Sequence, residues 1–353
     1  MTLKDLGYNE ALEQIRTEGG LAHFEVGRVT AEHKERYTVR TAEGEVNAEV
    51  IGKLRATASD RLDFPAVGDW VALMMHEPGH ATIHHVFPRT SLITRKAIGT
   101  FGGTQVIAAN VDHAFLVQAV DRDFNINRLE RYLTICHAAG VGPIIVLTKT
   151  DLVEEHHVEE IEERIRARIA NVPIIALSNM ATDGCDAIRR SIEKGKTYCL
   201  LGSSGVGKST LMNNLIGAQV MHTGSISERT SKGRHITSHR ELVVLDGGGI
   251  IIDNPGMREV GITDAEGGLE GTFERIAALA KECRFKDCTH TTETGCAVLQ
   301  ALQRGELDDA SVANYHKMQR EASHFQTTVA GRRKKEKQFG RIMKRYKKDM
   351  GKL

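Results

Sequence analysis

The sequence has no long apolar run and no apolar segment of the kind that directs secretion. A membrane-spanning helix needs about 18 consecutive apolar residues, and no such stretch occurs in the 353 residues. Residues 1–20 are amphipathic and charged, and they lack the apolar core of a secretory signal. Membrane and extracellular proteins are therefore excluded, and we expect a cytoplasmic protein without a membrane partner.

The chain also has almost no net charge, because 47 Lys and Arg stand against 46 Asp and Glu, giving +1. Its 41% hydrophobic and 26% charged residues are typical of a globular protein. Residues 331–353 nevertheless hold 11 basic and 2 acidic side chains and carry +9, which leaves −8 for the other 330 residues. Such a basic tail favours an anionic partner such as RNA, although a solvated tail without a partner has the same composition.

Aromatic residues make up only 5% of the chain, and there is one tryptophan. Those we considered in segment 21–96 lie in short stretches of alternating apolar and polar residues, so we interpret them as core rather than as a base-stacking surface. They are Tyr37, Phe64, Trp70 and Phe87. Turn residues separate these stretches, which predicts a small antiparallel barrel of OB type or, as the alternative, an SH3-like one.

After residue 105 the pattern changes to continuous apolar runs, such as PIIVL and YCLL, separated by helical stretches. This alternation predicts a doubly wound, mostly parallel α/β sheet. From residue 269 the strand signal disappears and helices are expected. The predicted fold is therefore a multidomain α/β protein with five segments: an N-terminal extension (1–20), an OB-type RNA-binding barrel (21–96), an α/β domain (97–264), a helical zinc-binding domain (265–330) and the basic tail (331–353).

Residues 202–209, GSSGVGKS, fit the phosphate-loop pattern GxxxxGK[ST] between an apolar strand and a helix. Glycines let backbone N–H groups point inward around phosphate oxygens, and the helix N-terminus adds the positive end of its dipole. Lys208 would reach the outer phosphates, and Ser209 would coordinate Mg²⁺. A chance glycine turn is the alternative. The expected nucleotide contacts are Gly202, Ser203, Ser204, Gly205, Val206, Gly207, Lys208, Ser209 and Thr210.

The four residues after the run PIIVL are similar to the guanine-binding loop NKxD, with threonine in its first position: Thr148, Lys149, Thr150 and Asp151. The Asp151 carboxylate can accept hydrogen bonds from N1–H and the 2-amino group of guanine, whereas adenine offers neither donor. The alternative is an ordinary helix cap. This guanine loop therefore predicts that the nucleotide held by the phosphate loop has guanine as its base.

Two further loops complete the predicted pocket. Ser178 and Asn179, after the next apolar run, are similar to the loop that closes over the base. Asp253 and Gly256 match the pattern DxxG, in which the aspartate holds an Mg²⁺-bound water and the glycine N–H contacts the γ-phosphate. The guanine and closing loops here precede the phosphate loop, which reverses the usual order in GTPases. Because such a site depends on where strands end in space, the pocket survives this permutation.

Three of the six cysteines are clustered with a histidine within 14 residues, at Cys283, Cys288, His290 and Cys296. Three thiolates and one imidazole, with no position left for water, are typical of a closed structural Zn²⁺ site. A metal would also hold together the compact loop that this short spacing requires. Free buried cysteines are the alternative, and the other three cysteines are interpreted as ordinary core or surface residues.

Together these segments make the chain resemble the family of ribosome small subunit-dependent GTPases, RsgA. The resemblance rests on the segments NRLERYL, TKTD, LLGSSGVGKSTLMNNL, SKGRH, DNPGMREVG and CRFKDCTHTTETGCAV. It implies a barrel that contacts ribosomal RNA, a circularly permuted GTPase domain, one zinc ion per chain and late maturation of the small ribosomal subunit. It also implies that this subunit stimulates hydrolysis of GTP.

The resemblance further implies which residues act in hydrolysis. Met257 follows DxxG where many GTPases have glutamine, and it cannot orient the attacking water. His235 is therefore the candidate that positions water, with a surface histidine as the alternative, and Lys208 is the candidate phosphate-binding cation. The expected Mg²⁺ ligands are Ser209, Thr237 and Asp253.

Two functions remain open from the sequence. The first is a GTP hydrolase, acting as a monomer, whose hydrolysis times its release from the maturing small subunit. The second is a placeholder on the ribosome or its RNA that uses GTP as a structural ligand with negligible turnover.

Overall fold

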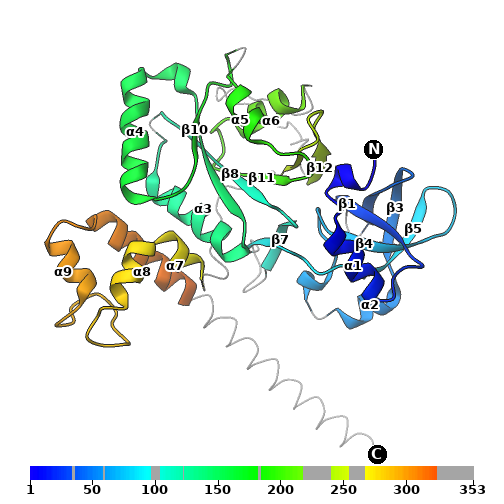
Figure 1. The fold of residues 1–353 in the computed structure, drawn as a ribbon, viewed down its shortest axis with the longest axis horizontal. Helices are drawn as coiled ribbons and strands as arrows, with labels where there is room; N and C mark the ends of the chain where they lie inside the picture. Colours follow the sequence, from blue (N-terminus) through cyan, green and yellow to red (C-terminus); the bar gives the residue numbers. More distant parts are fainter. Residues whose placement is uncertain are drawn as a thin grey trace, which may run out of the picture.

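We analysed a computed structural model of the chain. It describes residues 1–33, 36–58, 60–96, 104–121, 123–181, 184–217, 240–253 and 267–323. Figure 1 shows three parts: a barrel near the N-terminus, a central α/β sheet with helices, and a helical part near residue 300. Among the described helices, none combines the length and the apolar character needed to cross a bilayer.

The N-terminal barrel closes through pairing of its first and fourth strands, in the order β1-β2-β3-β5-β4. All its pairings are antiparallel except β3 with β5, and a short helix joins β3 to β4. This is the five-stranded OB arrangement. Its elements are β1 (Glu25–His33), β2 (Arg36–Thr41), β3 (Glu45–Val50), α2 (Gly52–Thr57), η2 (Arg61–Asp63), β4 (Trp70–Met75) and β5 (His80–Val86).

The aromatic residues predicted as core do fill the barrel's apolar layers. Tyr37, Trp70 and Phe87 are at most 2% exposed. Tyr37 lies in the barrel core, against which Phe64 packs, whereas Trp70 and Phe87 lie in a second apolar cluster shared with the N-terminal residues. The N-terminal residues form η1 (Lys4–Leu6) and α1 (Glu10–Glu18), whose apolar side chains pack on the Trp70 side of the barrel. The residues before the barrel are therefore built onto it as a cap.

The central sheet has the strand order β10-β9-β8-β11-β13-β12 and is parallel except for β12. One apolar core lies under α3 and α4 and another under α5 and α6, so helices cover both faces. The predicted doubly wound sheet is confirmed. Its elements are β8 (His113–Ala119), α3 (Ile126–Ala139), β9 (Gly142–Thr148), η3 (Thr150–Leu152), α4 (Glu155–Arg168), β10 (Ile174–Ala176), α5 (Asp186–Ser191), β11 (Thr197–Leu201), α6 (Lys208–Ile216), β12 (Glu241–Val244) and β13 (Ile250–Asp253).

The barrel and the central sheet are joined through backbone pairing, because β1 pairs with β12 at Ala31 and Glu241. The buried Arg28 guanidinium adds hydrogen bonds to the carbonyl oxygens of Leu6, Gly68 and Asn110, at 2.6, 3.1 and 3.1 Å. A two-stranded sheet of β6 (Leu92–Lys96) and β7 (Thr104–Ala109) connects the two parts along the chain.

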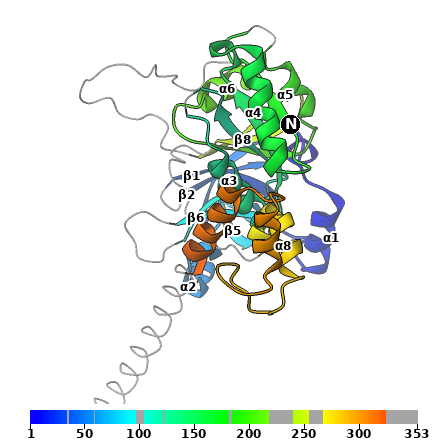
Figure 2. The same ribbon diagram turned by 90° about the vertical axis from the view of Figure 1, so that its left-hand side faces the viewer.

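The helical part near the C-terminus has its own small core and packs on α3 (Figure 2). Its elements are α7 (Gly268–Thr272), α8 (Glu274–Ala280), α9 (Ala297–Gln303) and a helical stretch over 309–323. Arg131 of α3 forms two hydrogen bonds of 2.7 Å with Glu321. The buried Glu130 accepts hydrogen bonds from Arg168 of α4 and from Asn314, so charged groups hold this contact.

Candidate functional site

The phosphate loop, residues 202–209, connects β11 to α6 at the carboxyl end of the central sheet. A Cβ atom at Gly202 would lie 2.5 Å from the Val117 carbonyl oxygen, and Gly207 has a φ of +94°, so both positions require glycine. Nζ of Lys208 donates to the carbonyl oxygens of Gly202 and Ser203, at 2.7 and 2.5 Å. The loop therefore folds around its own lysine, at the N-terminus of a helix.

The surroundings of Lys208 in this loop change the pKa of its amine. Burial lowers the pKa of Lys208 to about 8, and the negative charge of nearby Asp253 opposes that shift. Asp253 ends β13, beside the phosphate-loop strand β11. A cation and a carboxylate at one end of the sheet are what a phosphate–Mg²⁺ site needs.

The guanine loop, residues 148–151, is hydrogen-bonded directly to the phosphate loop. The Thr148 hydroxyl donates to the Val206 carbonyl oxygen at 2.6 Å and lies 3.2 Å from the Gln118 carbonyl oxygen. Thr148 is fully buried. Threonine in the first position of this loop therefore links the guanine loop to the phosphate loop.

Lys149 and Asp151 take different positions in this loop. Lys149 has a left-handed backbone, with φ of 62°, and its Nζ lies 2.9 Å from the Asp121 carboxylate. Asp151 accepts a hydrogen bond of 2.5 Å from the Ser178 hydroxyl of the closing loop, residues 177–180. That contact leaves the second carboxylate oxygen to accept from a ligand.

The closing loop also reaches the phosphate loop. Nδ2 of Asn179 donates to the Gly207 carbonyl oxygen at 3.1 Å. The predicted residues Thr148, Asp151, Ser178 and Asn179 thus converge with the phosphate loop, although they lie 23 to 54 residues before its first residue, Gly202. Thr150 begins η3 and Ser209 and Thr210 lie in the first turn of α6.

Several predicted site residues lie outside the described part of the chain: Gly256, His235 and Thr237, together with Met257 and the basic tail 331–353. Sequence reasoning also missed residues that support the site, above all Asp121, the partner of Lys149. Asp121 follows the end of β8, and ligands of α/β sheets bind at the carboxyl ends of strands. The position of Asp121 just after a strand is therefore the feature of the sequence from which it could have been predicted.

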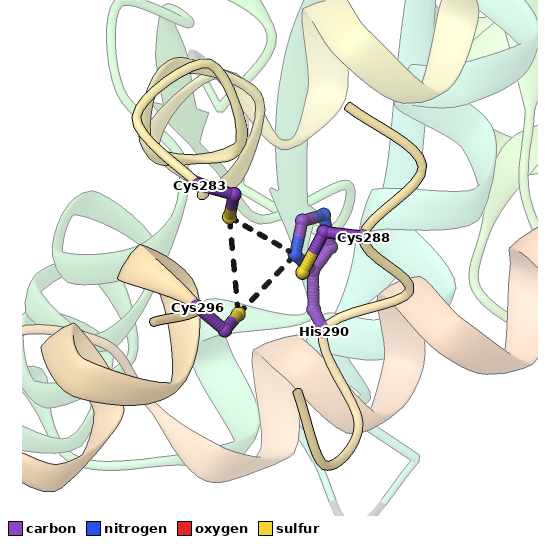
Figure 3. Close-up of side chains that lie close together, drawn as sticks. All are labelled: Cys283, Cys288, His290 and Cys296. Atoms are coloured by element: carbon purple, nitrogen blue, oxygen red, sulfur yellow. Dashed lines mark hydrogen bonds between the residues drawn. The ribbon is translucent and has the colours of Figure 1, made fainter. Parts of the chain in front are cut away.

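The predicted metal ligands form a second candidate site, shown in Figure 3. Within the described residues, the sulfurs of Cys283, Cys288 and Cys296 and a ring nitrogen of His290 all lie within 4.8 Å of one another. The Cys283 and Cys296 sulfurs are 3.9 Å apart and lie 3.6 and 3.4 Å from Nδ1 of His290. Tetrahedral zinc with Zn–S bonds of about 2.3 Å would separate two sulfurs by about 3.8 Å. The donor set and its spacing therefore fit a zinc ion.

The loop that carries this cluster is held in shape by polar contacts. The Glu293 carboxylate accepts hydrogen bonds from the Thr289 hydroxyl and from the backbone N–H groups of Thr291 and Thr289, the latter two at 2.9 and 2.7 Å, and these bonds lower its pKa. Nε2 of His316 lies 3.2 Å from the His290 carbonyl oxygen and braces the ligand's backbone. The remaining cysteines, Cys136, Cys185 and Cys199, are buried away from the cluster, as expected.

Three features together define a class of protein. They are an OB-type barrel, a P-loop α/β domain whose guanine loop precedes its phosphate loop, and a helical part with a cluster of three cysteines and one histidine. The chain has the architecture of a circularly permuted P-loop GTPase.

Comparison with known proteins gives the same class and a family. Residues 86–263 match the model of the RsgA GTPase family. The chain is 42% identical to the small ribosomal subunit biogenesis GTPase RsgA of Opitutus terrae, over 92% of this chain and 90% of that protein. It is 40% identical to the protein of the same name from Methanosarcina acetivorans, over 98% and 94%.

Solved structures resemble the fold over most of the chain. The crystal structure of YjeQ from Thermotoga maritima has a TM-score of 0.63 and 26% identity, covering 84% of this chain and 98% of that one. YloQ, described as a circularly permuted GTPase, has a TM-score of 0.62 and 24% identity, covering 86% and 96%. The chain therefore belongs to the RsgA GTPase family.

Proposed function

We propose that this protein binds GTP in the pocket formed by the guanine, closing and phosphate loops and hydrolyses it. One observation carries the proposal. Three loops are hydrogen-bonded to one another at a single end of the sheet: the guanine loop (148–151), the closing loop (177–180) and the phosphate loop (202–209). Their order along the chain is that of a circularly permuted GTPase. An arbitrary glycine turn or helix cap would not bring these three segments together.

In this pocket Asp151 reads the base and the phosphate loop holds the phosphates. The Asp151 carboxylate is oriented by Ser178 and accepts from N1–H and the 2-amino group of guanine. An adenine would leave that carboxylate unpaired, which discriminates strongly between the bases. The backbone N–H groups of the phosphate loop surround the phosphate oxygens, and Lys208 exchanges its carbonyl partners for the outer phosphates.

The residues for hydrolysis are assigned as proposals. Ser209, Thr237 and Asp253 hold Mg²⁺, which neutralises charge on the phosphates when it is bound. His235 positions the attacking water in place of the glutamine that Met257 replaces. Intrinsic hydrolysis is then slow and depends on a partner, as in GTPases that need activators.

The cluster of Cys283, Cys288, His290 and Cys296 holds one structural zinc ion per chain. Three thiolates with one imidazole suit zinc, and a site with four protein ligands has no open position for catalysis. The ion organises the loop between α8 and α9 rather than taking part in hydrolysis.

The partner we propose is the small ribosomal subunit with its RNA, and the names of the relatives support it because they connect those proteins with biogenesis of that subunit. We assign RNA binding to the barrel (21–96), nucleotide binding to 97–264, the metal to 265–330 and phosphate-backbone contact to the tail (331–353). The protein binds the subunit as a monomer in its GTP state, in the cytoplasm, and is released on hydrolysis during late maturation of the subunit.

Single-turnover hydrolysis of GTP, measured with and without purified small ribosomal subunits, tests this function. Stimulation by the small subunit, and not by large subunits, is the expected result. Tight binding of GTP without any stimulation would instead support the placeholder that uses GTP as a structural ligand. Equal binding of ATP and GTP would refute the assignment of the base.

A further inference from the structure

Asn214 lies on α6, the helix that begins at the phosphate loop, and it contacts the closing loop directly. Its Nδ2 donates to the Asn179 carbonyl oxygen at 2.8 Å and lies 3.6 Å from the Cys185 sulfur. Asn214 is half-buried and six residues beyond Lys208, so it is too far along the helix to belong to the phosphate-loop pattern. Its amide therefore links two loops from outside both of their motifs.

A second contact makes this link reciprocal. Nη2 of Arg189, on α5, donates to the Asn214 carbonyl oxygen at 2.6 Å. Since α5 directly follows the closing loop in the chain, the segment that contains both is fixed to α6 at two points. The Asn214 side chain donates toward the closing loop, and the Asn214 backbone accepts from the helix after it.

The contacted segment is the one that orients the base-reading carboxylate. Ser178 donates to Asp151, and Asn179 donates to the Gly207 carbonyl oxygen of the phosphate loop. A shift of the closing loop relative to α6 would therefore move both the hydroxyl that orients Asp151 and the contact with Gly207. Misplacement of such groups by a fraction of an ångström weakens recognition that depends on their geometry.

We propose that Asn214 is a positioning residue for guanine recognition: it fixes the closing loop to the phosphate-loop helix and thereby sets the position of Ser178 against Asp151. This inference rests on the proposed nucleotide site. Asn214 acts through the closing loop rather than on the nucleotide itself, and its main effect falls on the base end of the pocket.

The test compares ligands that use the base end with a ligand that does not. Affinities for GDP, for ADP and for pyrophosphate with Mg²⁺ are measured by competition for the unmodified protein and for Asn214→Asp, which keeps the shape but loses the donor. We expect GDP binding to weaken about five- to tenfold, the range for losing one such hydrogen bond. Pyrophosphate affinity should change by less than about twofold, and the unfolding temperature should drop by no more than the few degrees that the loss of one hydrogen bond costs. Asn47→Asp, at an exposed position of β3, is the matched charge control.

The result that overturns the inference is unchanged GDP affinity, or equal weakening of GDP and pyrophosphate, because a residue that only supports α6 would affect both ligands. If Asn214→Asp does not fold, Arg189→Gln breaks the other half of the link and should weaken GDP about twofold while sparing pyrophosphate. If the unmodified protein itself does not prefer GDP over ADP, the proposed base site fails, and that outcome is distinct from failure of the role of Asn214.

Discussion

The nucleotide pocket and the cysteine–histidine cluster are built in opposite ways. In the pocket, the functional groups are hydrogen-bonded to other protein groups: Lys208 to two carbonyl oxygens, Thr148 to a third, and Asp151 to Ser178. In the cluster, the three sulfurs and the imidazole contact mainly one another. The pocket is thus held by protein contacts, whereas the cluster is a set of donors arranged around one point.

This difference indicates what each site needs in order to form. Backbone strands and loop–loop hydrogen bonds position the pocket before any ligand contributes. Thiolates brought to about 4 Å repel one another unless a cation neutralises them, so the cluster needs a metal in addition to the polar contacts of its loop. Removing the ligand should therefore leave the pocket folded and should unfold the cluster.

The largest expected effect is on the cluster. Cys288→Ser removes one of four ligands and should lose the single zinc ion and the fold of residues 267–323, because the small core there forms around the metal site. Elemental analysis and limited proteolysis measure both losses. GDP affinity should stay within about threefold, since the helical part has a core of its own, separate from the two cores of the central sheet.

A cysteine outside the cluster provides the control for this prediction. Cys136→Ala removes a buried thiol outside the cluster and should keep the zinc. A folded, metal-free protein with unchanged resistance to protease would contradict the structural role of the metal.

The second prediction concerns the base end of the pocket. Asp151→Asn replaces an acceptor by a donor, which suits the 2-carbonyl group of xanthine and opposes the 2-amino group of guanine. GDP affinity should fall about 10²-fold, and preference should shift to xanthosine diphosphate. Competition binding with the two nucleotides measures the exchange. Retention of the guanine preference would show that another residue reads the base.

The third prediction uses the pKa of Lys208, which burial lowers to about 8. Bound phosphates favour the charged amine, so binding takes up a proton where the free protein has lost it, and affinity falls as pH rises through 8. Between pH 7 and pH 9 the affinity for GDP should decrease about tenfold, as the protonated fraction does. Lys208→Arg stays charged and should show a flatter profile. Parallel profiles for the two proteins would remove Lys208 from the phosphate site.

The smallest expected effect concerns the contact between the central α/β part and the helical part that carries the cluster. Glu130 on α3 bridges Arg168 and Asn314, with hydrogen bonds of 2.7 and 2.5 Å. Glu130→Gln keeps the shape but removes the buried carboxylate that pairs with Arg168, which keeps its ion pair with Asp308 at 3.3 Å. Because Arg168 keeps that second partner and glutamine still offers a hydrogen-bonding oxygen, the loss of stability should be only about 0.5–1.5 kcal/mol.

The unfolding temperature should drop in Glu130→Gln while zinc content and GDP affinity are retained. Glu162→Gln, whose partner Arg166 is exposed, is the control and should change little. A loss of nucleotide binding in Glu130→Gln would show that the two regions are coupled more tightly than their construction indicates.

Much of this architecture could be predicted from local sequence. Continuous apolar runs such as PIIVL become parallel strands, and GSSGVGKS becomes a loop with positive-φ glycines, because both depend on residues close together in the chain. The cluster of Cys283, Cys288, His290 and Cys296 was predictable for the same reason, since a short spacing brings its ligands together.

The features that could not be predicted from local sequence are contacts between residues far apart in the chain. Asn214 meets Asn179 across 35 residues and Glu130 meets Asn314 across 184, and no local pattern marks either partner. The pairing of β1 with β12, which joins barrel to sheet, likewise depends on how the edge strand of the central sheet meets the barrel in three dimensions. Such pairings follow from the folded topology rather than from periodicity.

A crystal structure with a non-hydrolysable GTP analogue and Mg²⁺ tests the central claim most directly. We predict that one nucleotide spans the pocket, with Nζ of Lys208 about 3 Å from its outer phosphates and the Asp151 carboxylate accepting from its guanine. A nucleotide whose base lies away from Asp151 while its phosphates lie elsewhere than on Lys208 would contradict the account.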